Sequence, residues 1–233
     1  GLAAMAALLW LRVDVERLIP LLLGFLILTI ASERVELARL ALPPHADRVL
    51  LAAALALAVT AVAGVLVPLW GGRAMALLLC GLVVWLARHD VARRTISSVG
   101  LPRFAAAAML LGYAWLFTAG LAWLLAGDLV GGSEPGAAYD LVIHAVTLGF
   151  VMSMVLAHAP VILPAVLRRP LPFHPVLWVV LGLLHASLLA RVVLGDLAGL
   201  TGAWRVGASG TVLALLVLPP VIAWSVARGR HTA

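Results

Sequence analysis

Three histidines lie inside long apolar stretches in the second half of the chain: His144, His158 and His185. An imidazole buried in a membrane needs a partner, because an unpaired polar group in an apolar environment costs free energy. Imidazole is also a common ligand of haem iron and of copper. We therefore predict these three residues as metal ligands. His174 is a weaker fourth candidate, because it lies at a helix start where water can satisfy it.

The spacing of the histidines predicts two facing stripes. Each residue of an α-helix turns the chain by about 100°, so the fourteen positions from His144 to His158 place both rings on one face. The eleven positions from His174 to His185 do the same on the next helix. If the two helices are antiparallel neighbours, His158 and His185 lie at similar heights, within side-chain reach.

The scarcity of carboxylates inside these stretches narrows the choice of cofactor. A hard cation needs several oxygen ligands, and Asp140 and Asp196 stand only at helix ends. We expect haem, most simply of the b type, with copper as the alternative. Helices in contact lie about 8–10 Å apart, so a haem shared by His158 and His185 would require a splayed hairpin or a ligand from another helix. Arg191 could hold a haem propionate or pair with Asp196.

A structural explanation of the same histidines stays open. Each ring could form a hydrogen bond to a neighbouring helix and take no part in chemistry. The protein would then be a permease or a membrane anchor without enzymatic activity.

The composition indicates the elements that must hold these residues. Of 233 residues, 64% are hydrophobic and 11% are charged, against roughly 25% charged in soluble domains. Continuous apolar runs rich in Leu and Ala indicate helices, since barrel strands alternate. We predict an all-α integral membrane bundle forming a single domain over 1–233, with tight turns at 70–73 and 168–172. The seven predicted spans are 18–31, 49–70, 74–88, 104–126, 141–167, 175–195 and 207–227.

The arginines predict the orientation of the bundle. The net charge of +6 comes from sixteen Arg with no Lys, and it lies between apolar stretches, which indicates membrane topology and no nucleic-acid partner. One side carries eleven: Arg34, Arg39, Arg48, Arg88, Arg93, Arg94, Arg103, Arg168, Arg169, Arg228 and Arg230. The other side carries four: Arg12, Arg17, Arg73 and Arg205. The richer side, with the C-terminus, is predicted to be cytoplasmic in a bacterial inner membrane.

The N-terminal apolar run and the single cysteine are two further features of the sequence. The apolar run from Gly1 to Leu11 is too short to span a bilayer, so we expect an interfacial helix or the remnant of an earlier span, in a native chain that extends further. Cys80 is the single cysteine, which excludes a disulfide within the chain.

A family resemblance rests on the motif His144-x-x-x-Leu148-Gly149-Phe150, followed by His158-x-Pro160. It resembles the polytopic haem-binding bacterial membrane proteins of the NnrS type, and it is similar to the histidine-bearing helices of small relatives of haem–copper oxidase subunit one. The resemblance covers residues 139–196. It implies a redox or nitric-oxide-related role, with the lipid bilayer and other membrane subunits as partners. The chain lacks a paired His-His motif and a His-x-x-x-Tyr pair, so a complete oxygen-reducing or nitric-oxide-reducing centre is not expected.

The arginine asymmetry makes a prediction about topology. A reporter fused after Ala233 should be cytoplasmic, and a reporter inserted near Gly132 should lie outside, because positively charged loops are retained in the cytoplasm. Alkaline phosphatase and fluorescent-protein fusions would measure both positions. Finding both reporters on the same side would contradict the odd number of spans.

Overall fold

The structure is a computed structural model that describes residues 1–10, 12–38, 46–131, 136–168 and 173–229. Within these ranges the chain is helical and has no strand. Seven helices in the described part of the chain are long and apolar enough to cross a membrane, which confirms the predicted all-α membrane bundle. These spans are Val15–Glu33, Ala46–Leu66, Pro68–His89, Leu101–Ala126, Ala137–Val166, Val176–Leu197 and Thr201–Trp224. Three arginines of the predicted cytoplasmic side, Arg39, Arg169 and Arg230, and most of the predicted turn at 168–172 lie outside the described residues.

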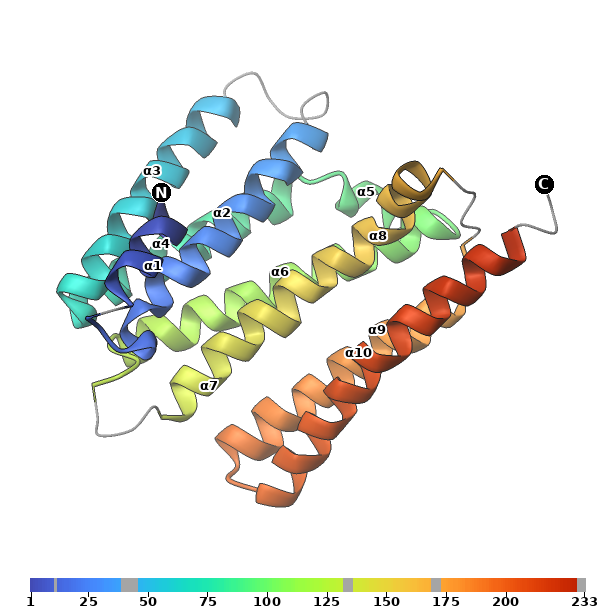
Figure 1. Cartoon of the computed structure of the whole chain (residues 1–233). Helices are drawn as coiled ribbons and strands as arrows, with labels where there is room; N and C mark the ends of the chain where they lie inside the picture. The colour runs from blue at the N-terminus through green and yellow to red at the C-terminus, as the bar shows by residue number, and fades with distance from the viewer. Residues whose placement is uncertain (11, 39–45, 132–135, 169–172, 230–233) are drawn as a thin grey trace. The chain divides into compact units, whose positions relative to one another are not determined.

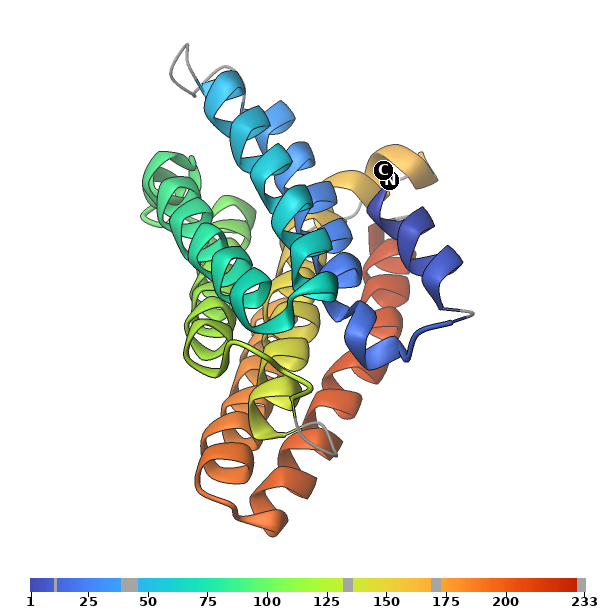
Figure 2. The same cartoon turned by 90° about the vertical axis from the view of Figure 1, so that its left-hand side faces the viewer.

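The chain groups into two compact units, of which the first comprises Gly1–Val91 and Tyr113–Val146. It begins with α1 (Leu2–Leu9), the 3₁₀-helix η1 (Val15–Leu18) and α2 (Ile19–Ala38). It continues with α3 (Ala46–Leu66), α4 (Pro68–His89), the second half of α6 (Leu101–Ala126) and α7 (Ala137–His144). Figure 2 shows α3 between its neighbours α2 and α4, with which it packs.

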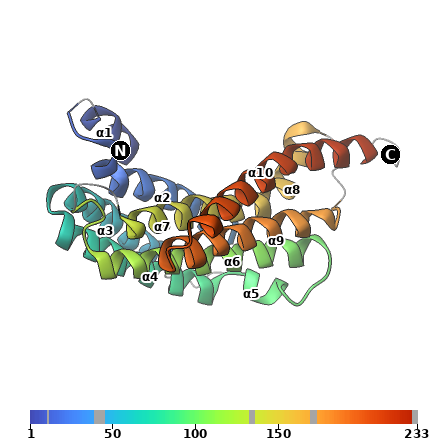
Figure 3. The ribbon, with the colours of Figure 1, turned by 90° about the horizontal axis from the view of Figure 1, so that it is seen from below.

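The second unit comprises Ala92–Gly112 and Thr147–Ala233. It holds α5 (Ala92–Thr95), the first half of α6, α8 (Met152–Leu167), α9 (Val176–Leu189) and α10 (Thr201–Gly229). Two π-helical segments join these elements: η2 (Ala145–Val151), which leads from α7 into α8, and η3 (Ala190–Leu197), which follows α9. Figures 1 and 3 show α9 and α10 side by side, and α10 packs on both α9 and η3.

The outward faces of the spans are apolar. On α3, Leu51 is 62% exposed, Val59 is 68% exposed and Leu66 is 75% exposed. Exposed apolar patches of this kind are rare on soluble proteins, whereas lipid tails cover them in a bilayer. The N-terminal run forms α1, which is not one of the seven spans, as its length predicts.

The predicted turn at Trp70–Arg73 is wrong, because these residues lie in the first turns of α4. The chain reverses at Val67, and Pro68 begins α4, where its missing N–H removes a donor that would have no partner in the helix. Gly71 serves close packing instead. A methyl group built on Gly71 would lie 2.3 Å from the carbonyl carbon of Ala63 in α3.

The two π-helical segments change the geometry predicted for the histidines. A π turn uses i→i+5 hydrogen bonds, so the rotation of 100° per residue does not hold between Ala145 and Val151. The count that placed His144 and His158 on one face assumed an uninterrupted α-helix. His174 also precedes α9, which begins at Val176, so its eleven-residue count to His185 does not run along a single helix.

The contact at Gly71 predicts a large effect of one methyl group. Gly71→Ala should lower the free energy of unfolding by about 1–3 kcal/mol, because overpacking against backbone atoms forces α3 and α4 apart. Gly81→Ala is the matched control in the same helix, since nothing lies within 4 Å of a methyl group built there. Thermal unfolding in detergent, followed by size-exclusion chromatography, measures both. Equal stability of the two variants would contradict the close contact.

Candidate functional site

Among the described residues of the second unit, five polar side chains are buried: Ser153, His185, Ser187, Arg191 and Thr211. They come from α8, α9, η3 and α10, and none is more than 7% exposed. Buried polar groups in a membrane protein need partners. Their contacts therefore show which of them are committed to holding helices together.

His185 is engaged with α8 through its Nε2 atom. This atom lies 3.2 Å from Ser153 Oγ, and Ser153 Oγ itself donates to the carbonyl of Gly149 at 2.5 Å. A hydroxyl has one proton to donate, so Ser153 accepts in the contact with His185. The Nε2 atom of His185 therefore carries a proton, and in the neutral ring the lone pair is on Nδ1.

The side chain of His158 points from α8 in a different direction from that of Ser153. It is five residues beyond Ser153 in α8, which corresponds to a rotation of about 140° around the helix axis. The ring of His158 therefore does not share the face that Ser153 presents to His185. Its Nδ1 atom donates to the carbonyl of Met154 at 2.6 Å, because a carbonyl can only accept. The neutral ring then has its lone pair on Nε2.

His144 has the same arrangement in the first unit. Its Nδ1 atom lies 2.8 Å from the carbonyl oxygen of Asp140 and 3.2 Å from Asp140 Oδ1. Both are acceptors, so Nδ1 carries the proton and the lone pair is again on Nε2. His89, which lies at the end of α4, makes the corresponding bond to the carbonyl of Trp85 at 2.8 Å and stacks on its ring.

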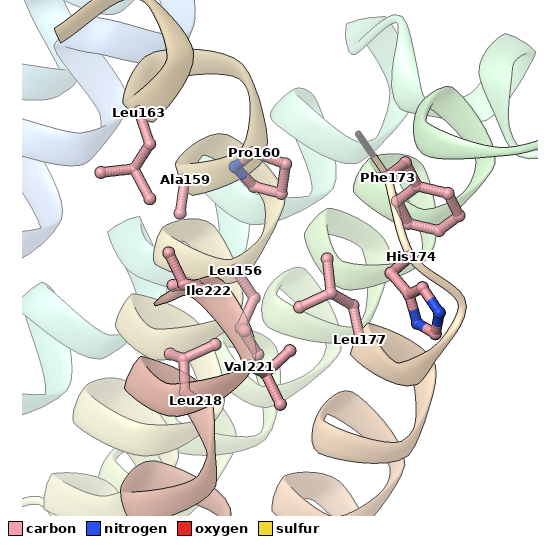
Figure 4. A pocket seen from close by; sticks show the side chains of 10 residues that line it. All are labelled: Leu156, Ala159, Pro160, Leu163, Phe173, His174, Leu177, Leu218, Val221 and Ile222. Atoms are coloured by element: carbon pink, nitrogen blue, oxygen red, sulfur yellow. The ribbon is translucent and has the colours of Figure 1, made fainter. Parts of the chain in front are cut away.

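His174 stands at the edge of an apolar pocket in the second unit. Figure 4 shows side chains of α8, α9 and α10 around this pocket, among them Leu156, Pro160 and Ile222. His174 Nδ1 accepts the N–H of Val176 at 3.2 Å, so in the neutral ring the proton is on Nε2. The ring packs edge-on against Trp224, with centroids 4.6 Å apart.

Arg191 is buried against an aromatic ring. Its guanidinium lies over Trp204 with 4.3 Å between Cζ and the ring centroid, a distance typical of a cation–π contact. Both residues belong to the hairpin of η3 and α10. The contact explains how one arginine is tolerated inside a span, and it fixes Arg191 against its neighbour.

A hydroxyl pair fastens α9 to α10. Ser187 Oγ and Thr211 Oγ1 lie 3.0 Å apart, and the backbones approach closely at two glycines. A methyl group on Gly207 would lie 2.6 Å from the carbonyl oxygen of Ser187, and one on Gly210 would lie 2.8 Å from Ser187 Cβ. Small residues allow this close approach.

The structure divides the four predicted ligands into two pairs. In the neutral rings of His144 and His158, the proton is on Nδ1 and the lone pair is on Nε2. In the neutral rings of His174 and His185, the proton is on Nε2 and the lone pair is on Nδ1. Among the described residues, no group of three or more His, Cys, Asp or Glu side chains could hold a metal ion. His144 belongs to the first unit, and the other three belong to the second.

Several contributors to the polar interior were not predicted from the sequence. These are Thr211, Trp204, Gly207 and Gly210 on α10, and the pair of Tyr113 and Asp90, whose Oη donates to Oδ2 at 2.5 Å. The run of small residues from Gly207 to Thr211 is a readable signal for a helix contact. Asp90 follows α4 directly and gave no sign of a partner 23 residues away.

The fold and the site define a seven-span helical membrane protein with a polar interior. Residues 1–227 match the family described as Domain of unknown function (DUF8744), and the chain belongs to this family. No curated protein and no solved structure matches the chain.

The hydroxyl pair predicts a difference between two threonines. Thr211→Val should lower the free energy of unfolding by about 0.6–1.7 kcal/mol, the range for hydrogen bonds between membrane helices. Thr118→Val is the matched control, because Thr118 also bonds the carbonyl four residues before it but is exposed. Reversible unfolding in mixed micelles measures both variants. A Thr118 variant that loses as much stability as the Thr211 variant would contradict an interhelical role for the pair.

Proposed function

We propose that the protein is a membrane haem-binding protein with histidine ligands and a redox or nitric-oxide-related role. One observation supports this most: the Nδ1–H···O=C bonds of His158 and His144. Metal-ligating histidines almost always donate their second ring N–H to a carbonyl or carboxylate, which fixes the tautomer and raises the basicity of the ligating nitrogen. We propose His158 as the first ligand, and His144, which lies in the other unit and would belong to a separate site, as the second.

The donor set suits haem better than a metal ion held by protein atoms alone. Haem iron receives its equatorial ligands from the porphyrin and needs one or two side chains from the protein. A copper site commonly needs three, and the described residues assemble no such group. Copper is therefore the second choice. When bound, a b-type haem would supply electron transfer or the binding of a small gas.

The protein's own residues would bind and orient the cofactor. The carbonyl of Met154 would hold the His158 ring in one tautomer, and Asp140 would do the same for His144. Apolar side chains around the spans would exclude water. Arg191 is committed to Trp204, so its proposed contact with a propionate is a smaller part of the hypothesis.

The cellular setting is part of the same proposal. We place the protein in a bacterial inner membrane with the C-terminus in the cytoplasm, on the basis of the arginine asymmetry. The resemblance to NnrS-type proteins and to small relatives of oxidase subunit one favours a role within a larger respiratory-type assembly, with other membrane subunits as partners.

A membrane anchor or permease is the second candidate function. The contacts of His185 with Ser153 and of Ser187 with Thr211 favour it, because they use polar side chains to hold helices together. On this alternative all the histidines are structural.

Absorption spectroscopy tests the haem proposal. Protein expressed with added 5-aminolaevulinate and purified in detergent should show a Soret band and bind haem stoichiometrically. His158→Ala and His144→Ala should each lower the haem content, because each removes a basic Nε2. His185→Ala is the matched control, since its Nε2 bonds Ser153; it should keep the band while losing thermal stability.

The contrary results are equally specific. A wild-type protein that shows no Soret band after reconstitution with haem would support the anchor or permease. So would a triple variant of His144, His158 and His185 whose absorption and metal content stay at wild-type levels. Loss of the band in the His185 variant alone would reverse the proposed choice of ligands.

A further inference from the structure

A polar cavity of about 260 Å³ lies in the first unit. It is slightly smaller than the roughly 300–1,000 Å³ of sites for drug-sized ligands, so it suits a compact group. Its lining comes from the starts of the spans Val15–Glu33 and Pro68–His89 and from the ends of Ala46–Leu66 and Leu101–Ala126. Successive spans cross the bilayer in opposite directions, so these four termini lie on the same side. The cavity is therefore at one membrane interface.

The lining carries charges of both signs. Glu16 and Asp128 contribute carboxylates, and Arg17 contributes a guanidinium. Asp128 Oδ1 accepts the backbone N–H of Val130 at 2.9 Å, which holds the carboxylate in place while its second oxygen is available to a ligand. A ligand of this cavity should therefore itself carry both a positive and a negative group.

A buried donor lies at the inner wall. Trp123 lines the cavity and is 1% exposed, so its indole forms part of the inner wall. A methyl group on Gly72 would lie 2.9 Å from this nitrogen and 2.2 Å from the carbonyl oxygen of Gly127. Glycine at position 72 thus lets α4 approach the indole and the backbone at Gly127 closely. Buried indole N–H groups usually have a hydrogen-bond acceptor, and a ligand oxygen would supply it.

We propose that this cavity binds a phosphate ester that carries a primary ammonium group. The ammonium has three N–H donors, which match the carboxylates of Glu16 and Asp128. The phosphate oxygens match the Arg17 guanidinium and the Trp123 N–H. A metal ion would have no use for the indole donor, and a simple anion would meet two carboxylates. The phosphoethanolamine headgroup of a bilayer lipid has this chemistry, and so does free phosphoethanolamine.

Native mass spectrometry of the delipidated, detergent-purified full chain tests the proposal. We expect phosphatidylethanolamine to bind about tenfold or more tightly than phosphatidylcholine, whose quaternary ammonium has no N–H to donate. Combining Glu16→Gln with Asp128→Asn should abolish this preference, while the amide oxygen introduced at position 128 can still accept the N–H of Val130. Trp123→Phe should weaken both lipids several-fold, because it removes the donor that faces the phosphate.

Two controls isolate the cavity from the rest of the interface. Asp14→Asn removes an exposed carboxylate near the start of the same span, and Trp70→Phe removes an exposed indole at the start of α4; neither residue lines the cavity. Both should leave the preference unchanged. Thermal melts of all variants check that binding is compared between folded proteins. Glu16→Gln alone is the substitution that should disturb folding least, because Glu16 is only half-buried.

The outcomes are distinct. If free phosphoethanolamine competes with the lipid at similar concentrations, the site binds a soluble ligand. If the lipid binds tightly and free phosphoethanolamine does not compete, the site binds a lipid of the bilayer. Equal binding of the two lipids by the wild type would overturn the proposal. Preference that survives in the folded double variant would overturn it as well. The haem proposal is unaffected by either result, because none of the described residues that line the cavity is a histidine.

Discussion

Hydrogen bonding inside an apolar slab is the constraint on which the rest of this structure depends. No water is available there, so each polar side chain must find an acceptor within the protein. Thr29, Thr60, Thr118 and Ser153 all donate to the carbonyl four residues before them. His144 and His158 do the same with Nδ1. These polar groups are thus satisfied within their own helix, whereas bonds such as that between His185 and Ser153 join two helices.

The interhelical bonds of Ser153 and Ser187 lie at places where the backbones come close. Ser187 meets Thr211 where Gly207 and Gly210 have no side chains in the way. Gly112 likewise faces Ser153, with 3.1 Å between a built methyl group and Ser153 Cβ, and Ser153 is the residue that accepts from His185. Short polar side chains can bond across an interface only when the helices approach closely, so the glycines and the hydroxyls depend on one another.

The sequence predicted the spans well, because a run of about 20 apolar residues has few alternatives to a membrane helix. The predictions from the sequence were wrong where packing between helices decides the local backbone geometry. Trp70–Arg73 looked like a turn because two glycines are adjacent, yet Pro68 begins the helix earlier and Gly71 fits against Ala63. The π-helical segments η2 and η3 had no readable signal, since a single extra residue per turn leaves the composition unchanged. The face shared by His144 and His158 was therefore predicted on a wrong assumption.

Residue type also says less about a histidine than its hydrogen bonds do. His144, His158 and His185 look equivalent in the sequence, and all three were predicted as ligands. His158 donates through Nδ1 to a carbonyl of its own helix, so in the neutral ring the lone pair is on Nε2. His185 uses Nε2 to bond Ser153 on the neighbouring helix, so freeing that nitrogen for a metal would break an interhelical contact. The described bond of His158 stays within its own helix, whereas that of His185 joins two helices, and this difference is the reason for proposing His158 as a ligand and His185 as a structural residue.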